Sequence, residues 1–300
     1  PLYVGSGSPL SNVGTLTNQG IELEVGYKLS VDKVNLSFLA NASYVKNEIK
    51  NLGNQTGYID KESLPTLGTV SRNQNGYPIG YFFGYKAIGV FQTQEEIDNY
   101  ISPATGKPIQ PNAVPGDTKF EDLNGDGVIS DDNEDRTMIG KPNPDWMVGL
   151  TVAADWNGFD LSAFFQGSFG ADVFDALRRY ELAAVNYTSD ALERWTGPGT
   201  SNSMPRIVLG DTPKNFRPST LLVHDASFLR LRNLQVGYTL PAQLTRKAYI
   251  QRLRFYASFD NLLTITGYKG MDPEIGSTMG IDKGVYPQAR VYTFGLNLTF

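Results

Sequence analysis

Residues 146–169 read WMVGLTVAADWNGFDLSAFFQGSF, and apolar side chains recur at every second position on both sides of an Asn-Gly pair. Period-two alternation is the pattern of a β-strand with one apolar face. Asn157-Gly158 suits the positive φ angles of a type I′ hairpin turn. Each half is long enough to cross the hydrocarbon core of a membrane at a tilt, which takes about 9–11 residues. The stretch therefore predicts a membrane-length β-hairpin.

The same alternation marks five further segments. Ile21 to Leu29 carries an apolar residue at every odd position, and the last segment ends on Phe300. Soluble strands average ~5–6 residues, so strands of this length favour a membrane barrel over a soluble β-sandwich. We predict an all-β chain with one antiparallel meander of about seven strands. They lie near residues 20–30, 34–45, 146–156, 159–169, 228–240, 253–263 and 289–300.

Composition excludes several other classes of protein. The 300 residues hold 31 Gly, 16 Tyr and 16 Phe but no Cys, and His224 is the single His. Thiol chemistry and His-rich metal sites are therefore excluded, and a Ser-His triad is disfavoured. The net charge of −5 disfavours a nucleic-acid surface. No run of ~18 apolar residues occurs, which excludes a helical membrane span.

The connections between the predicted strands alternate between short and long. Short turns at 31–33 and 157–158 fall on one side of the meander, whereas the long segments 46–145, 170–222 and 264–289 fall on the other. Outer-membrane barrels have short periplasmic turns and long extracellular loops, so we expect the C-terminus in the periplasm. Closed bacterial barrels have an even number of strands, and an open edge is not viable in lipid. The sequence thus predicts part of a larger transmembrane β-barrel.

Several motifs carry a resemblance to a known family. They are NVGTLTNQGIELEVGY at 12–27, PGDTKFEDLNGDGVISDDNEDRTMIGKPNPDWMVGL at 115–150, WNGFDLSAFFQGSFGADVF at 156–174, FLRLRNLQVGYTLP at 228–241, LRFYASFDNLLTITGYKGMDPEI at 253–275 and YPQARVYTFGLNLTF at 286–300. In this order they resemble the C-terminal part of the SusC/RagA family of TonB-linked outer-membrane transporters. The resemblance covers nearly the whole of residues 1–300.

The resemblance implies a fold, a location and partners. It implies the C-terminal portion of a barrel of about 22 strands, the size of transporters with a plugged lumen, in the outer membrane of a Gram-negative bacterium. The family's signal peptide, N-terminal plug and TonB box are expected upstream of these residues. It further implies uptake of glycan or peptide fragments under a SusD-like surface lipoprotein, energised through TonB, with outer-membrane lipid around the barrel and no catalytic residues.

Two other functions remain open from the sequence. A passive outer-membrane porin or adhesin shares the barrel, and only the plug and TonB box separate it from an importer. A secreted, calcium-stabilised carbohydrate-active β protein also fits an all-β composition. Against this second alternative, no pair of acids stands out from the alternating pattern, and strands of membrane length are unexplained.

The sharpest local motif is DLNGDGVIS at 122–130. Oxygen side chains at positions 1, 3 and 5, Gly at 6 and a backbone carbonyl at 7 form the first part of an EF-hand-type calcium loop. Asn133 stands at position 12, where a bidentate acid is expected. The alternative is a solvated Asx-rich turn. The motif predicts a structural Ca²⁺ ion held by Asp122, Asn124, Asp126, the Val128 carbonyl, and Asp132 or Asp135.

Three further segments give weaker predictions. The aromatic run from Tyr81 to Phe91 suits packing within a loop, or stacking on sugar rings. Residues 175–185, DALRRYELAAV, read as a short helix. Arg230, Arg232, Arg252 and Arg254 are expected to line the lumen or to reach the membrane interface.

Overall fold

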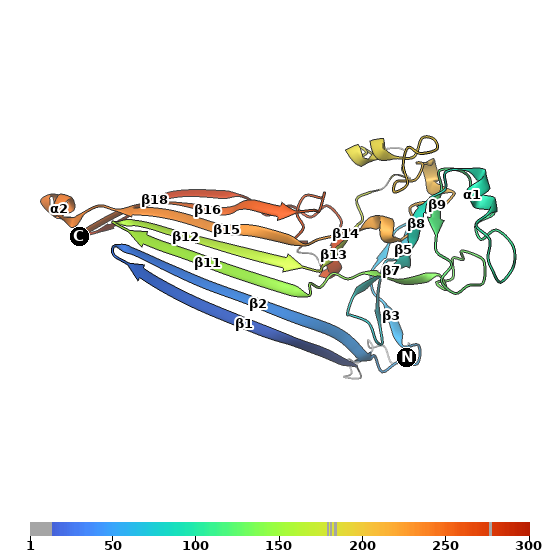
Figure 1. The fold of residues 1–300 in the computed structure, drawn as a ribbon, viewed down its shortest axis with the longest axis horizontal. Coiled ribbons are helices and arrows are strands. Elements are labelled where there is room, and N and C mark those ends of the chain that lie inside the picture. The colour runs from blue at the N-terminus through green and yellow to red at the C-terminus, as the bar shows by residue number, and fades with distance from the viewer. Residues whose placement is uncertain (1–13, 179, 181, 183–184, 276–277) are drawn as a thin grey trace, which may run out of the picture.

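A single long antiparallel sheet dominates the structure. The computed structural model describes residues 14–178, 180, 182, 185–275 and 278–300. The sheet has seven strands in the order β1-β2-β11-β12-β15-β16-β18 (Figure 1). Each long strand pairs with the long strand before it and the one after it in the chain. The predicted meander is therefore confirmed. Its strands are β1 Thr15–Val31, β2 Val34–Asn51, β11 Trp146–Trp156, β12 Phe159–Phe169, β15 Phe228–Thr239, β16 Arg252–Thr266 and β18 Val291–Thr299.

The register gathers apolar side chains on one face of this sheet. Leu150 lies opposite Ala40 on one side and Phe165 on the other. The next row holds Gly149 between Asn41 and Gln166, and it belongs to the opposite face. Successive strand residues point to opposite faces, so this register separates an apolar face from a polar one. Side chains of the apolar face are widely exposed, including Ile21 at 74% and Phe294 at 76%.

The first hairpin is longer than its apolar pattern indicates. Thr15 to Gly20 pair with Val45 to Asn51, and most of these side chains are polar. Period-two alternation of apolar residues cannot mark strands beyond the apolar zone. The segment 46–145 consequently begins as strand, and the part outside the large sheet starts after Asn51.

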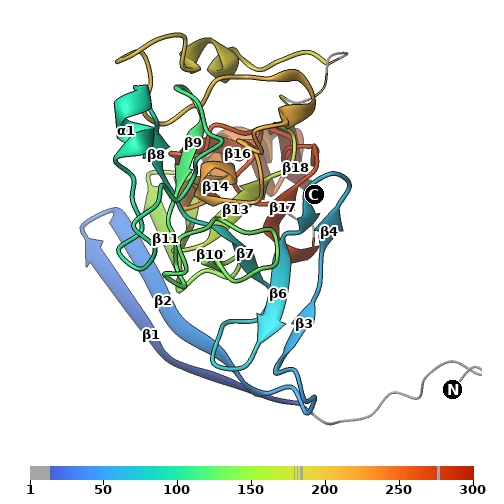
Figure 2. The ribbon, with the colours of Figure 1, turned by 90° about the vertical axis from the view of Figure 1, so that its right-hand side faces the viewer.

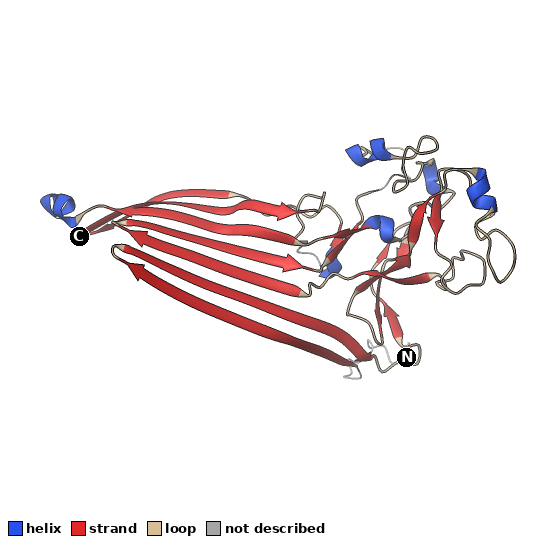
Figure 3. Ribbon diagram, viewed as in Figure 1, coloured by secondary structure: helices blue, strands red, loops and turns tan. Residues whose placement is uncertain are grey.

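Connections of different length gather at opposite ends of the sheet. The turns at residues 32–33 and 157–158 and the segment 240–251 lie at the end where the C-terminus is found (Figures 1 and 3). Residues 52–145, 170–227 and 267–290 lie at the other end, and we call them the loop body. Asn157 has a φ of 46° and Gly158 a φ of 87°, as a type I′ turn requires.

Small sheets build the loop body (Figure 2). A four-stranded sheet has the order β10-β7-β6-β3, and a three-stranded sheet has the order β14-β13-β17. Two further pairs are β4 with β5 and β8 with β9. Their bounds are β3 Tyr58–Asp60, β4 Ser63–Leu64, β5 Gly68–Thr69, β6 Ser71–Gln74, β7 Tyr81–Tyr85, β8 Ala87–Val90, β9 Thr118–Phe120, β10 Arg136–Gly140, β13 Asp172–Asp175, β14 Val223–Asp225 and β17 Ile281–Asp282.

Helices are short, and one predicted helix is wrong. Asp175 ends β13, and residues 176–178, which follow it, have no helical assignment; residues 179, 181 and 183–184 lie outside the described part. The pairing of Phe174 with Val223 and Ile281 sets this backbone, and a local pattern cannot show such distant partners. No helix of the described residues has the length and apolarity to cross a membrane. The helices are α1 Gln94–Asp98, η2 Ser189–Glu193, η3 Leu209–Asp211, η4 Thr220–Leu222, α2 Ala242–Thr245, η5 Arg246–Ala248 and η6 Thr278–Gly280.

Candidate functional site

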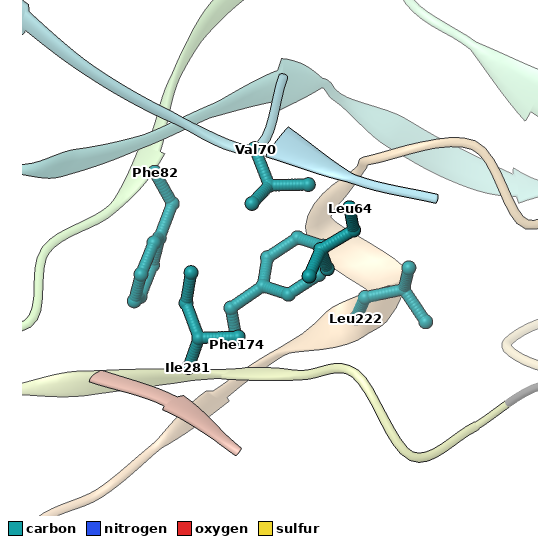
Figure 4. Close-up of a cluster of buried hydrophobic side chains, with 6 residues drawn as sticks. All are labelled: Leu64, Val70, Phe82, Phe174, Leu222 and Ile281. Carbon is teal, nitrogen blue, oxygen red and sulfur yellow. The ribbon is translucent and has the colours of Figure 1, made fainter. Parts of the chain in front are cut away.

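One buried core joins all three segments of the loop body (Figure 4). Phe82 comes from 52–145, Phe174 from 170–227 and Ile281 from 267–290, and each is at most 1% exposed. The rings of Phe82 and Phe174 lie 5.8 Å apart between centroids. Buried apolar area stabilises each segment only while the other two are in place. The loop body is therefore one packed unit. The cluster consists of Leu64, Val70, Phe82, Phe174, Leu222 and Ile281.

The aromatic run after residue 80 packs inside this unit. Every residue of β7 is buried, and Tyr81, Phe82 and Phe83 are each at most 3% exposed. Tyr85 is 4% exposed, and its hydroxyl donates to the Ser130 carbonyl at 2.7 Å. Rings with so little exposed surface cannot stack on a sugar. The packing interpretation of this run is correct.

The polar face of the large sheet is a wall of charged and amide side chains. Arg254 donates from Nε to Asp160 Oδ1 at 2.9 Å and from Nη2 to Gln235 Oε1 at 3.0 Å. Asn233 donates to Asp260 Oδ1 at 2.6 Å. These residues come from three adjacent strands. The polar face therefore presents fixed donors and acceptors.

Two arginines of β15 attach the loop body to this wall. Arg230, whose side chain is 2% exposed, donates to Glu274 at 3.0 Å and to Asp272 at 2.5 Å. Arg232 donates to both oxygens of Glu274, at 2.6 and 2.7 Å. We call these four residues the arginine clamp. It fixes residues 267–290 against the polar face.

The sequence signal for the clamp lies in two separate motifs. Arg230 and Arg232 are spaced as residues i and i+2 of a strand, whereas Asp272 and Glu274 have the same spacing in a loop. The arginines were predicted to line the lumen or reach the interface, without partners. The equal spacing of the two arginines and the two acids is the sequence signal from which the ion pairs could have been predicted.

The acidic loop at 122–135 adopts the turn that its motif predicts. Asp122 accepts the backbone N–H of Gly125 at 2.8 Å and that of Gly127 at 2.9 Å. Asp126 accepts the N–H of Val128 at 2.9 Å. Gly127 has a φ of 86°, and a Cβ there would lie 2.7 Å from Ser102. The first half of the motif is therefore folded tightly against residues 102–105.

Its second half distinguishes the two candidate acids. Asp135 is fully buried and accepts the N–H groups of Leu123 at 3.1 Å and Ser130 at 3.0 Å, so it turns back onto the loop. Asp132 is exposed and accepts the Ser130 hydroxyl, which holds the pKa of its carboxyl below the usual range. Of the two acids, Asp135 is therefore the one that packs against the loop. Among the described residues, no three acidic or histidine side chains converge in a ready metal cluster.

Known proteins match this chain over all or nearly all of its length. It is 33% identical over all its residues to TonB-dependent receptor P3 of Formosa agariphila, and covers 30% of that protein. It is 30% identical to TonB-dependent receptor SusC of Bacteroides thetaiotaomicron over 96% of this chain, and covers 27% of that protein. The RagAB peptide transporter matches the whole fold with a TM-score of 0.76 and 26% identity, over 31% of that chain. No family model matches.

This chain belongs to the SusC/RagA family of TonB-dependent receptors. Its long sheet is a C-terminal portion of a transmembrane antiparallel β-barrel, as predicted. The matched proteins are named receptors and importers, so the chain belongs to a class of transport proteins and not of enzymes. The chain spans about a third or less of each curated relative, from 27% to 32%.

Proposed function

We propose that this SusC-like chain is part of an active importer in the outer membrane. The observation that carries the proposal is the loop body, in which three long segments share one core at one end of a barrel sheet. A passive pore has no need of such a packed unit above its mouth. Long ordered loops on a rigid scaffold commonly carry binding functions. The relatives named TonB-dependent receptor support coupling to TonB through parts outside these residues.

The loop body faces the outside in this proposal, and a SusD-like lipoprotein docks on it. Several apolar side chains of the loop body are strongly exposed, among them Leu192 at 80%, Leu209 at 61% and Ile88 at 48%. Exposed apolar groups rimmed by polar ones are typical of partner surfaces. The similarity to the two-component RagAB transporter supports a partner of this kind. Glycan or peptide fragments would then pass along the polar wall of Arg254, Asp160 and Gln235.

Sidedness is tested by cysteine labelling, since residues 1–300 contain no Cys. Leu192→Cys lies on the loop body, and Leu244→Cys lies on α2 at the opposite end, with native exposures of 80% and 59%. A membrane-impermeant maleimide should label the first in intact cells and the second only after the outer membrane is permeabilised. The reverse pattern would invert the orientation.

Active import is tested by uptake with and without TonB. Cells that carry the complete receptor should lose uptake of its nutrient when TonB is deleted, while the barrel stays assembled. Unchanged uptake would identify a passive porin instead. Leu192→Glu should weaken co-purification of the lipoprotein, and Leu244→Glu, a matched change at the far end, should not.

A further inference from the structure

A charged cavity lies in the loop body, away from the polar wall. Its volume is about 450 Å³, and it opens between the β4–β5 turn, the start of β10 and residues 210–218. Among the described residues, three cations line it, Arg136, Lys214 and Arg217, together with two acids, Asp131 and Asp211. The positive charges therefore outnumber the negative ones.

Arg136 lies in this cavity without an ionic partner. Among the described residues, no carboxylate oxygen lies within 4 Å of its guanidinium nitrogens. It donates to neutral oxygens instead, from Nη2 to the carbonyls of Thr69 and, at 2.8 Å, Phe83, and from Nη1 to Asn133 Oδ1 at 2.7 Å. Its Nε is buried and has no hydrogen-bond partner. Burial lowers the pKa of this guanidinium, which reflects the cost of keeping the charge there.

Arg217 is the second incompletely compensated cation. Its side chain is 14% exposed, and its Nη1 is buried without a hydrogen bond. The Asp131 oxygen nearest to Nη1 lies 3.8 Å away, which makes an ion pair but no hydrogen bond. The guanidinium lies 4.7 Å from the centroid of Tyr85, and that of Arg136 lies 5.7 Å from the same centroid. Both guanidinium groups therefore lie close to the same aromatic ring.

The two acids of the cavity are already engaged. Asp131 is 67% exposed, and one of its oxygens binds Nζ of Lys214. Asp211 accepts the backbone N–H groups of Asn215 at 2.8 Å and Phe216 at 2.9 Å. Asp132 and Glu134 of the neighbouring acidic loop are exposed and make their own hydrogen bonds. None of these carboxylates therefore neutralises both arginines.

Unsatisfied donors concentrate at this place. Across the described residues, four buried side-chain nitrogen or oxygen atoms lack a hydrogen-bond partner. Two of them, Arg136 Nε and Arg217 Nη1, belong to the cavity lining, and a third, Ser219 Oγ, follows the lining residue Pro218. Buried polar groups are normally paired, and an uncompensated buried charge costs several kcal/mol. Such a cluster is expected where a ligand supplies the missing acceptor.

We propose that this cavity binds an oxyanion, the carboxylate or sulfate group of a small molecule. Planar guanidinium groups match both oxyanions through paired N–H donors. Lys214, whose side chain is 51% exposed, can turn from Asp131 to the bound anion. If the import function holds, the receptor favours acidic over neutral molecules. The site itself rests on the contacts of Arg136 and Arg217, whatever the receptor imports.

Binding is tested on the complete purified receptor with defined probes. Glucuronate supplies a carboxylate, inorganic sulfate supplies a sulfate, and glucose is the neutral control, all at constant ionic strength. Glucuronate or sulfate should raise the thermal midpoint and bind in calorimetry, and glucose should do neither. The stronger of the two charged probes identifies the oxyanion. Crystals soaked in selenate should show its anomalous signal between Arg136 and Arg217.

The variants separate this cavity from general charge effects. Arg217→Gln should weaken binding at least tenfold, and Lys214→Gln should do so to a smaller degree without removing a buried group. Lys269→Gln removes one charge from a 64% exposed side chain elsewhere on the loop body, and should change nothing.

Equal binding by all three variants, or a carboxylate from another segment of the receptor already placed between the arginines, would overturn the proposal. Binding is measured on purified protein, so the oxyanion proposal can be refuted while TonB-dependent uptake is still observed. Loss of TonB dependence would likewise leave the binding result intact.

Discussion

Arg230 and Glu274 join a barrel strand to the loop body: Nη1 of Arg230 on β15 donates to Oε2 of Glu274 at 3.0 Å. The same guanidinium also binds Asp272, so three largely buried charges meet on the polar face. Removal of one partner from such a group leaves an uncompensated charge, which costs more than the pairing itself contributes. The clamp is therefore a sensitive point in the attachment of residues 267–290.

Arg230→Met should destabilise this attachment by about 3–5 kcal/mol, because Asp272 then stays buried without its cation. Limited proteolysis should show faster cleavage within residues 267–290, while heat-modifiability shows the barrel intact. Arg230→Met combined with Asp272→Asn is the control, since it removes one charge of each sign and leaves Glu274 paired with Arg232. If the single variant resists protease as the native receptor does, the clamp contributes nothing.

The clamp should also weaken in acid. Burial raises the pKa of the Asp272 carboxyl, but N–H groups of Gln288 and Glu274 and the Arg230 guanidinium outweigh it, so the pKa is lowered overall. A carboxyl whose pKa is lowered in the folded state stabilises the fold at pH values above its unfolded-state pKa of ~3.9. This stabilisation is lost as the pH falls from there through the folded-state pKa. Protease resistance of residues 267–290 should be constant at neutral pH and fall below about pH 4. In Asp272→Asn this fall should be reduced.

We propose that the acidic loop binds calcium with a Kd of about 10⁻⁴–10⁻³ M, as in extracellular modules. Asp122, Asn124, Asp126, the Val128 carbonyl and Asp135 would hold the ion after small side-chain rotations. Because the Tyr85 hydroxyl binds the Ser130 carbonyl, terbium in this loop should show tyrosine-sensitised luminescence that calcium displaces.

Asp126→Ala should abolish the terbium signal, and Asp132→Ala should leave most of it, since Asp135 is the acid that turns inward. Luminescence that survives Asp126→Ala would place the ion elsewhere. Loop order that survives both chelation and this substitution would leave the loop as a self-supporting Asx turn.

The contact between Gly295 and Tyr256 predicts a steric requirement in the barrel wall. The two residues are paired across β16 and β18, and a Cβ at Gly295 would lie 2.5 Å from Cζ of the Tyr256 ring. Gly295→Val should cost about 1–3 kcal/mol through overpacking, measured as a lower urea midpoint. Tyr256→Ala in the same chain should recover most of this loss, and additive effects would refute the contact.

Phe300 is predicted to act in assembly and not in packing. It follows β18 and is 75% exposed, so its deletion removes little buried surface. Aromatic residues at the membrane interface anchor barrel strands, and an aromatic C-terminal residue resembles an assembly signal. Deletion of Phe300 should lower the amount of heat-modifiable barrel several-fold. Leu244→Ala, on α2 at the same end of the sheet and 59% exposed, is the control and should assemble normally.

The large sheet could be predicted from sequence, since its information is local. Alternation from Trp146 to Phe169 and the Asn157-Gly158 turn fix a hairpin without knowledge of any other segment. The ends of the first hairpin could not be predicted, because polar residues of 46–51 pair with polar partners and show no apolar period.

The loop body could not be predicted, since its contacts join distant residues. Phe82, Phe174 and Ile281 meet in one core although the chain passes through the membrane sheet between them. The same reason explains the wrong helix at 175–185: at its start Asp175 pairs with Asp282 of β17, and the Ala176 N–H donates to the Asp282 carbonyl at 3.0 Å. The acidic loop shows the intermediate case. DLNGDG predicts its turn, whereas only the structure shows that Asp135 is buried.

The shared core changes how the role of the loop body should be tested. Trimming any one of its three segments removes buried partners of the other two, so a trimmed receptor cannot separate docking from folding. Phe174→Ala creates a cavity in this core and should cost about 3–5 kcal/mol. Protease should then cut all three segments faster, while the barrel remains heat-modifiable, because the sheet has its own hydrogen bonds and lipid contacts.

Leu192→Ala, at an 80% exposed position, is the matched control and should leave the cleavage pattern unchanged. If Phe174→Ala speeds protease cleavage only within residues 170–227, the three segments fold independently. Trimming a single segment would then be a valid test of docking. If all three open together and the lipoprotein no longer co-purifies, the partner recognises the assembled body and not one loop.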